Sequence, residues 1–182
     1  MRLACGALLF VTLGCASTVT RLDGDRVREI ALADPDAEAE DGAVVTTLRP
    51  VPKLVIVGAG PMAEALSRTA DLLGWHVQAV TQPSTAAGLI AGLAALDKVV
   101  VMSHDDDISG PALSAALASR AGYIGSVGSR RVQQSRADWL AYRGITDLDR
   151  VHGPAGLDIG AGTPAEIAVS IVAEAIAAGR PA

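Results

Sequence analysis

The sequence predicts an α/β protein with a doubly wound, mostly parallel sheet and a small N-terminal β appendage. Three observations predict this fold. Short apolar runs alternate with helix-period segments from about residue 53 onwards, and a glycine-rich turn joins the first run to the first helix. Half of the 182 residues are hydrophobic but only 3% are aromatic. Strands and helices that alternate at this spacing are typical of parallel sheets with a helical layer on each face.

The strands and helices follow from apolar periodicity and from turn residues. The segment KLVIVG is a continuous apolar run typical of a buried parallel strand, and Met62, Leu66, Ala70 and Leu73 then recur at helical spacing. Thr163 is expected to cap the last helix, with Pro164 at the first helical position and Glu166 closing a capping box. The expected strands are 53–58, 76–80, 98–103, 122–126 and 149–153, and the expected helices are 61–74, 84–96, 110–121, 130–144 and a last one from 164.

Two parts of the chain differ in composition. Residues 34–41, DPDAEAED, hold five carboxylates and read as a solvated linker, so we divide the chain into an appendage, 1–42, and a main domain, 43–182. In the appendage we expect a strand followed by a hairpin with its turn at Asp23–Gly24. The uncharged stretch from Leu3 to Val19 leaves a cleaved secretory segment as the alternative.

Charge and cysteine content narrow the classes of partner. The formal net charge of −5 argues against nucleic acid held through its phosphates, and we expect no membrane partner. Cys5 and Cys15 do not form a disulfide framework or a metal site by number or spacing, and residues 16–182 contain no cysteine. This pattern fits a reducing compartment, so we expect a cytoplasmic protein.

The first loop with a chemical signal is VGAGPMA, which follows the strand at 53–58. Gly58, Gly60 and Ala63 match a Rossmann-like dinucleotide fingerprint with alanine in its last place. Backbone amides at the start of the following helix are suited to hold a phosphate. The acid that usually follows the second strand is replaced by Thr81 and Gln82, which weakens the case for NAD or NADP. A tight turn without a ligand is the alternative.

The second such loop is YIGSVGSRR. Gly125 and Gly128 free the backbone after the fourth strand, Ser129 is expected to cap the next helix, and Arg130 follows in its first turn. A positive side chain there opposes the helix dipole unless an anion is present. Between residues 120 and 150 there are six arginines and three aspartates, a local excess of +3. We expect Arg130 to contact an anion, whereas Arg131 could equally face solvent, and Arg136 and Arg143 are expected to form surface salt bridges.

A third loop, HGPAGLDIGAG, follows the fifth strand. Asp158 stands there between Gly156 and Gly160, and it either caps backbone amides or faces a ligand. His104 and Asp105 are more simply a turn and a helix cap than a metal site. No nucleophile with a neighbouring base is evident, so we predict no catalytic residue and no metal ligand.

Four motifs together resemble the XdhC/CoxI family, specifically its Rossmann-like C-terminal domain. They are PKLVIVGAGPMAEALSRTADLLGWHV, VVVMSHDDD, YIGSVGSRR and GPAGLDIGAGTPAEIAVSIVAEAIA, in the order in which the family has them. The resemblance implies an accessory protein for molybdenum hydroxylases such as xanthine dehydrogenase. Such proteins are associated with binding the molybdenum cofactor, with its sulfuration together with a cysteine desulfurase, and with its insertion into the apo-enzyme. It also implies that a cofactor phosphate would suit the Gly58–Gly60 turn, and that Arg130 would hold a second anionic group.

The sequence departs from the family at three places. Pro61 stands where many members have histidine, Thr81-Gln82 replaces an acid, and the larger N-terminal domain is reduced to about forty residues, with ACG at 4–6 as a short match to its cysteine–glycine motif. Our prediction is a non-catalytic carrier of the molybdenum cofactor, cytoplasmic, which serves a molybdenum hydroxylase; a homodimer is compatible with it. The alternatives are an NAD(P)-dependent oxidoreductase and a ligand-free module that docks on a partner.

Overall fold

The computed structural model describes residues 8–13, 16–23, 26–32 and 51–179. The chain divides into two units, Met1–Pro50 and Val51–Ala182. In the first unit, β1 (Leu8–Leu13), β2 (Ala16–Asp23) and β3 (Arg26–Leu32) form an antiparallel sheet in the order β1-β2-β3. Asp23 pairs with Arg26. The predicted turn residue Gly24 and the segment at 4–6 lie outside the described residues, as does the predicted boundary at 42.

The second unit is built on a parallel sheet of five strands. These are β4 (Lys53–Val57), β5 (His76–Val80), β6 (Lys98–Val101), β7 (Tyr123–Ser126) and β8 (Val151–His152). Their spatial order is β5-β4-β6-β7-β8, and every pair is parallel. The chain moves outward from β4 in one direction to β5 and in the other to β6. The topological switch point of the sheet therefore lies between β4 and β6.

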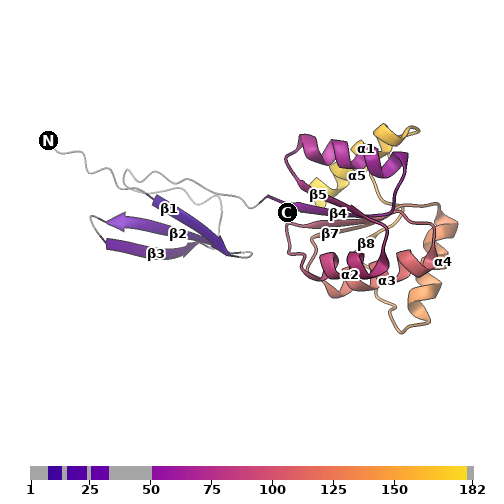
Figure 1. Cartoon of the computed structure of the whole chain (residues 1–182), viewed down its shortest axis with the longest axis horizontal. Helices are drawn as coiled ribbons and strands as arrows, with labels where there is room; N and C mark the ends of the chain where they lie inside the picture. The colour runs from indigo at the N-terminus through magenta and orange to yellow at the C-terminus, as the bar shows by residue number, and fades with distance from the viewer. Residues whose placement is uncertain (1–7, 14–15, 24–25, 33–50, 180–182) are drawn as a thin grey trace. The chain divides into compact units, whose positions relative to one another are not determined.

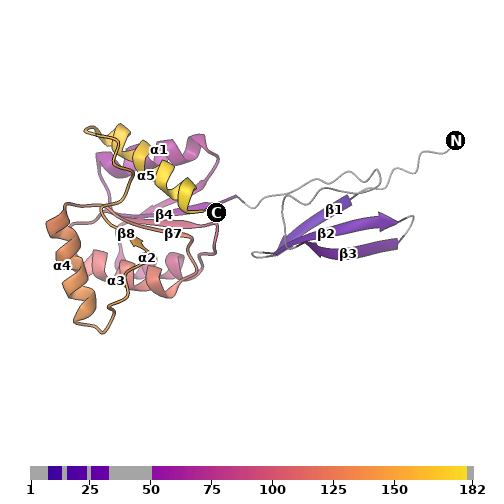
Figure 2. The same cartoon turned by 180° about the vertical axis from the view of Figure 1, so that it is seen from behind.

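Two helical layers cover the sheet (Figure 1), and the view from behind shows the same arrangement (Figure 2). One layer holds α1 (Pro61–Leu72) and α5 (Pro164–Ala178), which pack against each other. The other holds α2 (Pro83–Ala91), α3 (Asp106–Ala118) and α4 (Arg130–Ala141). The predicted doubly wound α/β fold is thereby confirmed.

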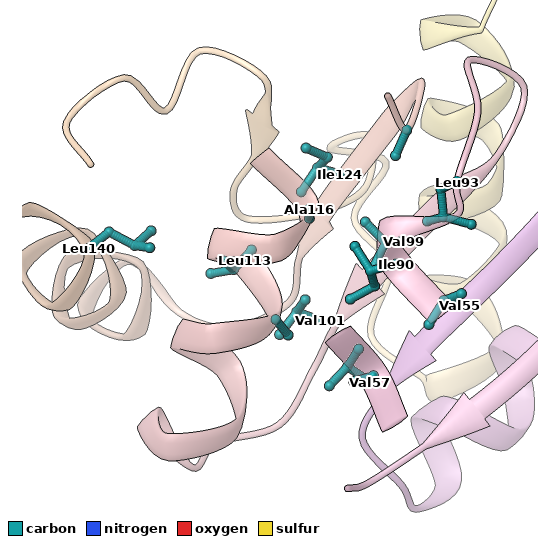
Figure 3. Packing of buried hydrophobic residues seen from close by; sticks show 13 residues of the cluster. Val55, Val57, Ile90, Leu93, Val99, Val101, Leu113, Ala116, Ile124 and Leu140 are labelled. Atoms are coloured by element: carbon teal, nitrogen blue, oxygen red, sulfur yellow. The ribbon is translucent and has the colours of Figure 1, made fainter. Parts of the chain in front are cut away.

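Alternating residues of β4 point into two separate hydrophobic clusters, because successive side chains of a strand point to opposite faces. Leu54 and Ile56 join the cluster under α1 and α5. Val55 and Val57 join the other cluster, where they pack with residues from α2, α3 and α4 such as Ile90 and Leu113 (Figure 3). The near absence of aromatic residues gives these layers small side chains and close packing.

Helix caps explain where the helices begin. Thr163 and Glu166 form the predicted capping box of α5, and Ser129 caps α4 as predicted by accepting from the N–H of Val132. The Asp105 carboxylate accepts from the N–H of Asp107 at 2.9 Å, which confirms its cap role. That cap lets α3 begin at Asp106, four residues before the predicted start, with Pro111 inside the helix.

Candidate functional site

The predicted site residues lie at the ends of β4, β7 and β8, in the loops that follow these strands and in the first turns of α1 and α4. Strands of a parallel sheet all end at the same edge, so these loops meet at the carboxyl edge of the sheet. Pockets open beside two of the helices that start there. One lies beside the first turn of α1 and the other beside the first turns of α4, in the opposite helical layer. Of the candidate residues, Gly58, Gly60 and Ala63 line the first pocket and Arg130 lines the second, and the others line neither.

The glycine turn after β4 needs glycine at two positions. Gly58 has a φ of 140°, and a Cβ there would lie 2.8 Å from Met102 Cγ and 3.2 Å from the backbone N of Ser103. The turn thus lets β4 pass close to the end of β6 at the switch point. Gly60 has a φ of 100°, and the space beside it is open, with no atom within 4 Å of an added Cβ.

The amino end of α1 has no side-chain cap. Gly60 occupies the cap position without a side chain, and Pro61 follows at the first helical position. The Gly58 N–H donates to Val80 O at 2.9 Å, so this amide supports the sheet instead of a ligand. The first-turn amides of Met62 and Ala63 have no acceptor within their own helix, as at any α-helix start.

The first pocket, of about 400 Å³, lies beside this turn. Its lining includes the predicted Gly58, Gly60 and Ala63, with Glu64, Ser67 and Arg68 from α1 and Thr81 from the end of β5. Thr81 thus stands at the wall where dinucleotide-binding domains place an acid. Glu64 and Arg68 approach to 3.9 Å and are both largely exposed, so the two charges of the lining offset each other.

The loop after β7 is shaped by close packing. A Cβ on Gly125 would lie 2.9 Å from Tyr123 Cε1, and a Cβ on Gly128, whose φ is 149°, would lie 2.8 Å from Val132 Cγ1. Gly125, Gly128 and Ser129 line neither pocket. Their roles in this structure are to pack the strand end and to begin α4.

Arg136 corrects the sequence analysis. It was expected in a surface salt bridge, but its side chain is 2% exposed and is among the largest fully buried ones. Its guanidinium donates to Ser126 Oγ at 2.6 Å, to Val127 O at 2.8 Å and to Ser103 O at 2.7 Å. The helical spacing of α4 did not reveal this, because a polar helix gives no signal for a buried cation.

The charge of Arg136 is not neutralised by direct contact within residues 51–179, where no carboxylate oxygen comes within 4.0 Å of it. Its Nε has no hydrogen-bond partner there either. Burial lowers the pKa of Arg136 from its ordinary value, and the Asp106 carboxylate partly opposes that shift. A buried positive charge therefore lies behind the loops that follow β6 and β7. Arg143, the other expected salt-bridge residue, instead stacks on the Trp139 ring at 3.4 Å.

The second pocket, of about 550 Å³, lies between α4 and the segment that leads into and out of β8. Arg130, the predicted anion-binding residue, belongs to its lining, whereas Arg131 does not. The pocket is lined by Leu113, Ser126, Arg130, Gln133, Gln134, Ala137, Leu140, Leu148, Val151, Gly153 and Pro154. No carboxylate is part of this lining, in contrast to the first pocket.

The loop after β8 is held by Glu174 of α5, a residue that sequence reasoning missed. Its Oε2 accepts from the N–H of Gly156 at 2.7 Å and from the Tyr123 hydroxyl at 2.6 Å. His152 Nδ1 lies 3.4 Å from Oε1 of the same carboxylate. Burial is the main cause that raises the pKa of the Tyr123 hydroxyl, and the contact with Glu174 raises this pKa further. An acid inside an apolar helix was the signal that could have identified this anchor.

The predicted residues of that loop have mainly backbone roles. Gly156 has a φ of 105°, and a Cβ there would overlap Ser170 Oγ. Asp158 and Gly160 are exposed, and none of the three lines either pocket. Within the described residues, no three His, Cys, Asp or Glu side chains gather as a metal-binding group. None of the described helices is long and apolar enough to cross a membrane.

Comparisons with known proteins agree with the fold. The family model of the XdhC Rossmann domain matches residues 54–175. The uncharacterized protein YqeB of Escherichia coli (strain K12) is 31% identical over 145 residues, which are 68% of this chain and 26% of that protein. The crystal structure of a xanthine dehydrogenase from Bacillus halodurans matches with a TM-score of 0.61 and 22% identity, over 88% of this chain and 55% of that chain. The chain thus spans about a quarter of the one relative and about half of the other.

Proposed function

Because this chain belongs to the XdhC family, we propose that it is an accessory protein for the maturation of molybdenum hydroxylases. It binds the molybdenum cofactor at the carboxyl edge of its sheet, assists sulfuration together with a cysteine desulfurase, and passes the cofactor to an apo-enzyme of the xanthine dehydrogenase type. This role is that of a carrier, and the chain's own residues bind and position the cofactor.

The observation that carries the proposal is the open glycine turn at the start of α1. A phosphate there would meet the first-turn amides and the positive end of the helix dipole, with no side chain of the chain already in that place. The open space beside Gly60 and the 400 Å³ pocket next to it leave room for the rest of a ligand. These features fit the terminal phosphate of the molybdenum cofactor.

The lining of the pocket disfavours the nicotinamide alternative. The end of β5 offers Thr81 in place of the acid that usually binds the ribose. A hydride-transfer enzyme also needs an acid or base beside the nicotinamide, and the carboxylate in the described lining of this pocket, Glu64, faces Arg68 at 3.9 Å. A carrier needs room for a phosphate at an open edge, and the uncapped start of α1 with the pocket beside it supports this role.

The proposal is tested by mass spectrometry of small molecules released from freshly purified protein, with and without a co-expressed molybdenum hydroxylase. We expect a pterin that carries phosphate. Ser67→Leu, which fills the pocket beside the glycine turn, should reduce the retained cofactor several-fold without unfolding the protein, since Ser67 lines that pocket and is not buried. Ala137→Leu, which fills the other pocket, is the matched control and should retain the cofactor.

Addition of NAD or NADP provides the opposing test. A ligand at a hundred times its dissociation constant stabilises a protein by about 2.7 kcal/mol. A clear rise in melting temperature with either nucleotide, without any bound pterin, would contradict the carrier role. Absence of every pterin together with a stable complex with another chain would favour the docking alternative.

A further inference from the structure

We infer that the second pocket is a binding site in its own right, for a planar nitrogen heterocycle that carries one anionic group. The site is separate from the glycine turn, because the two pockets have no lining residue in common and lie beside different helices. The inference is derived from the lining of the pocket and stands independently of the cofactor proposal.

The floor of the pocket is apolar. Leu113 of α3 and Leu140 of α4 are each 1% exposed, and both belong to the hydrophobic cluster that contains Val55 and Val57 (Figure 3). Ala137, Leu148 and Val151 complete this surface. A volume of about 550 Å³ lies within the range of small-molecule sites, which are mostly apolar with a few placed polar groups. Such a floor favours a flat ring system.

Gln133 supplies a fixed hydrogen-bond acceptor. Its Nε2 donates to Ser126 O at 2.8 Å and to Gly128 O at 3.2 Å, so both amide protons are used by the chain. Its Oε1 is directed towards Gly153, where an added Cβ would lie 2.8 Å from it, and both residues line the pocket. The pocket therefore offers a carbonyl oxygen of fixed orientation, which suits a ring N–H or an amino group.

Arg130 supplies the charge. It is the cation of the lining, and no carboxylate of the lining competes for it. Behind the wall, Arg136 adds a second positive charge through its bond to Ser126 Oγ. One positive group in the lining and a second behind it favour an anionic ligand, and the low dielectric around Arg136 reduces the screening of its charge.

The walls of the pocket are held in place before any ligand binds. Arg150 fixes the segment that carries Leu148 and Val151 by donating to Leu117 O, Ser119 O and Ala121 O at 2.8, 3.1 and 2.7 Å. Arg136 fixes the opposite wall through Ser126 and Val127. A preformed site loses little conformational entropy on binding.

Isothermal titration calorimetry with three probes tests the inference on the full chain. Pterin-6-carboxylate has a flat ring, N–H donors and one carboxylate, so we expect it to bind. 2-Naphthoate has the flat ring and the carboxylate but no N–H, so it should bind about tenfold more weakly because Gln133 Oε1 would be left without a donor. Guanosine 5′-monophosphate identifies the source of the ring: comparable binding indicates a nucleotide, and weaker binding indicates a free pterin-like ring.

Variants place the probe in this pocket. Arg130→Gln should weaken pterin-6-carboxylate about tenfold, the expected loss for a hydrogen bond to a charged group, while Arg131→Gln should leave the affinity unchanged. Ala137→Leu should fill the pocket and abolish binding. Ser67→Leu is the matched control, because it fills the first pocket instead. Each variant is checked for folding by thermal unfolding.

The outcomes separate this inference from the cofactor proposal. If pterin-6-carboxylate and guanosine 5′-monophosphate both fail to bind, or if Arg131→Gln and Ser67→Leu weaken binding as much as Arg130→Gln and Ala137→Leu, the inference is overturned. Probe binding that depends on Arg130 in a protein that retains no cofactor supports the pocket and contradicts the carrier role. Cofactor retention without probe binding supports the carrier role and contradicts the inference about the second pocket.

Discussion

The two pockets at the carboxyl edge are built in different ways. The pocket beside α1 is formed by backbone: glycines at φ 140° and 100°, and a helix whose start has no side-chain cap. The pocket beside α4 is formed by side chains: a helix capped by Ser129, a glutamine held by two carbonyl groups, and walls fixed by Arg136 and Arg150. The first suits a phosphate, and the second suits a ring with a charge.

This difference matters for how each pocket responds to mutation. A pocket formed by backbone is sensitive to added atoms at its glycines, whereas a pocket formed by side chains is sensitive to the loss of polar groups. Glycines that need a positive φ admit other residues only with strain. A buried polar side chain leaves its partners without hydrogen bonds when it is removed.

The largest effect is expected at Arg136. Arg136→Met keeps an unbranched apolar stem but leaves Ser103 O and Val127 O without their donor inside the protein. Removal of a charged group from such a buried network costs about 3 kcal/mol in free energy of unfolding. Urea denaturation measures it. Arg143→Met, at an exposed position just after the end of α4, is the control and should cost less than about 1 kcal/mol. Equal effects would show that the Arg136 network does not hold the wall.

Gly58→Ala tests the pocket beside α1, and Gly144→Ala, in the turn after α4, is its control. Gly58→Ala places a methyl group 2.8 Å from Met102 Cγ at a φ of 140°, so strain and overlap add up to about 2 kcal/mol. Gly144→Ala has a φ of 80° but open space around it, so strain alone should cost about 1 kcal/mol. The same denaturation experiment compares them. If Gly58→Ala costs no more than Gly144→Ala, the close approach of β4 to β6 does not require glycine.

The sequence predicts the first pocket better than the second for a physical reason. A glycine at a tight turn has few substitutes, so Gly58 and Gly60 are visible as a local pattern between a strand and a helix. Thr163 and Glu166 were identified from cap spacing, and Arg130 was predicted to bind an anion from its place in the first turn of α4. All of these depend on neighbours within a few residues.

What escaped prediction depends on contacts across the fold. Arg136 is bonded to residues 9, 10 and 33 positions away, and Glu174 is bonded to Tyr123 at a separation of 51. No local pattern distinguishes Arg136 from an exposed arginine on the same polar helix. Gln133 was missed in the same way, since its orientation comes from two carbonyl groups of the β7 loop.

The smallest effect is expected at the start of α5, where side-chain capping is complete and serves as the reference for the uncapped α1. Glu166 Oε2 accepts from the N–H groups of Gly162 and Thr163, both at 2.9 Å, and these bonds lower its pKa below the ordinary 4.5. Because the folded pKa is depressed, the charge stabilises the fold above pH 4.5, and that contribution is lost as the pH falls through the lowered value.

Glu166→Gln keeps an acceptor but removes the charge, so its melting temperature should lie slightly below that of the unchanged chain at pH 7. The gap should close as the pH falls below 4.5, where the unchanged chain takes up its own proton. Glu64→Gln, at the uncapped α1, is the control. The Glu64 carboxylate faces Arg68 at 3.9 Å and accepts no described backbone hydrogen bond. Any difference in melting temperature for this variant should therefore respond more to salt than to acid. A gap at Glu166 that persists unchanged at pH 3 would mean that the box acts through packing and that its carboxylate charge adds nothing.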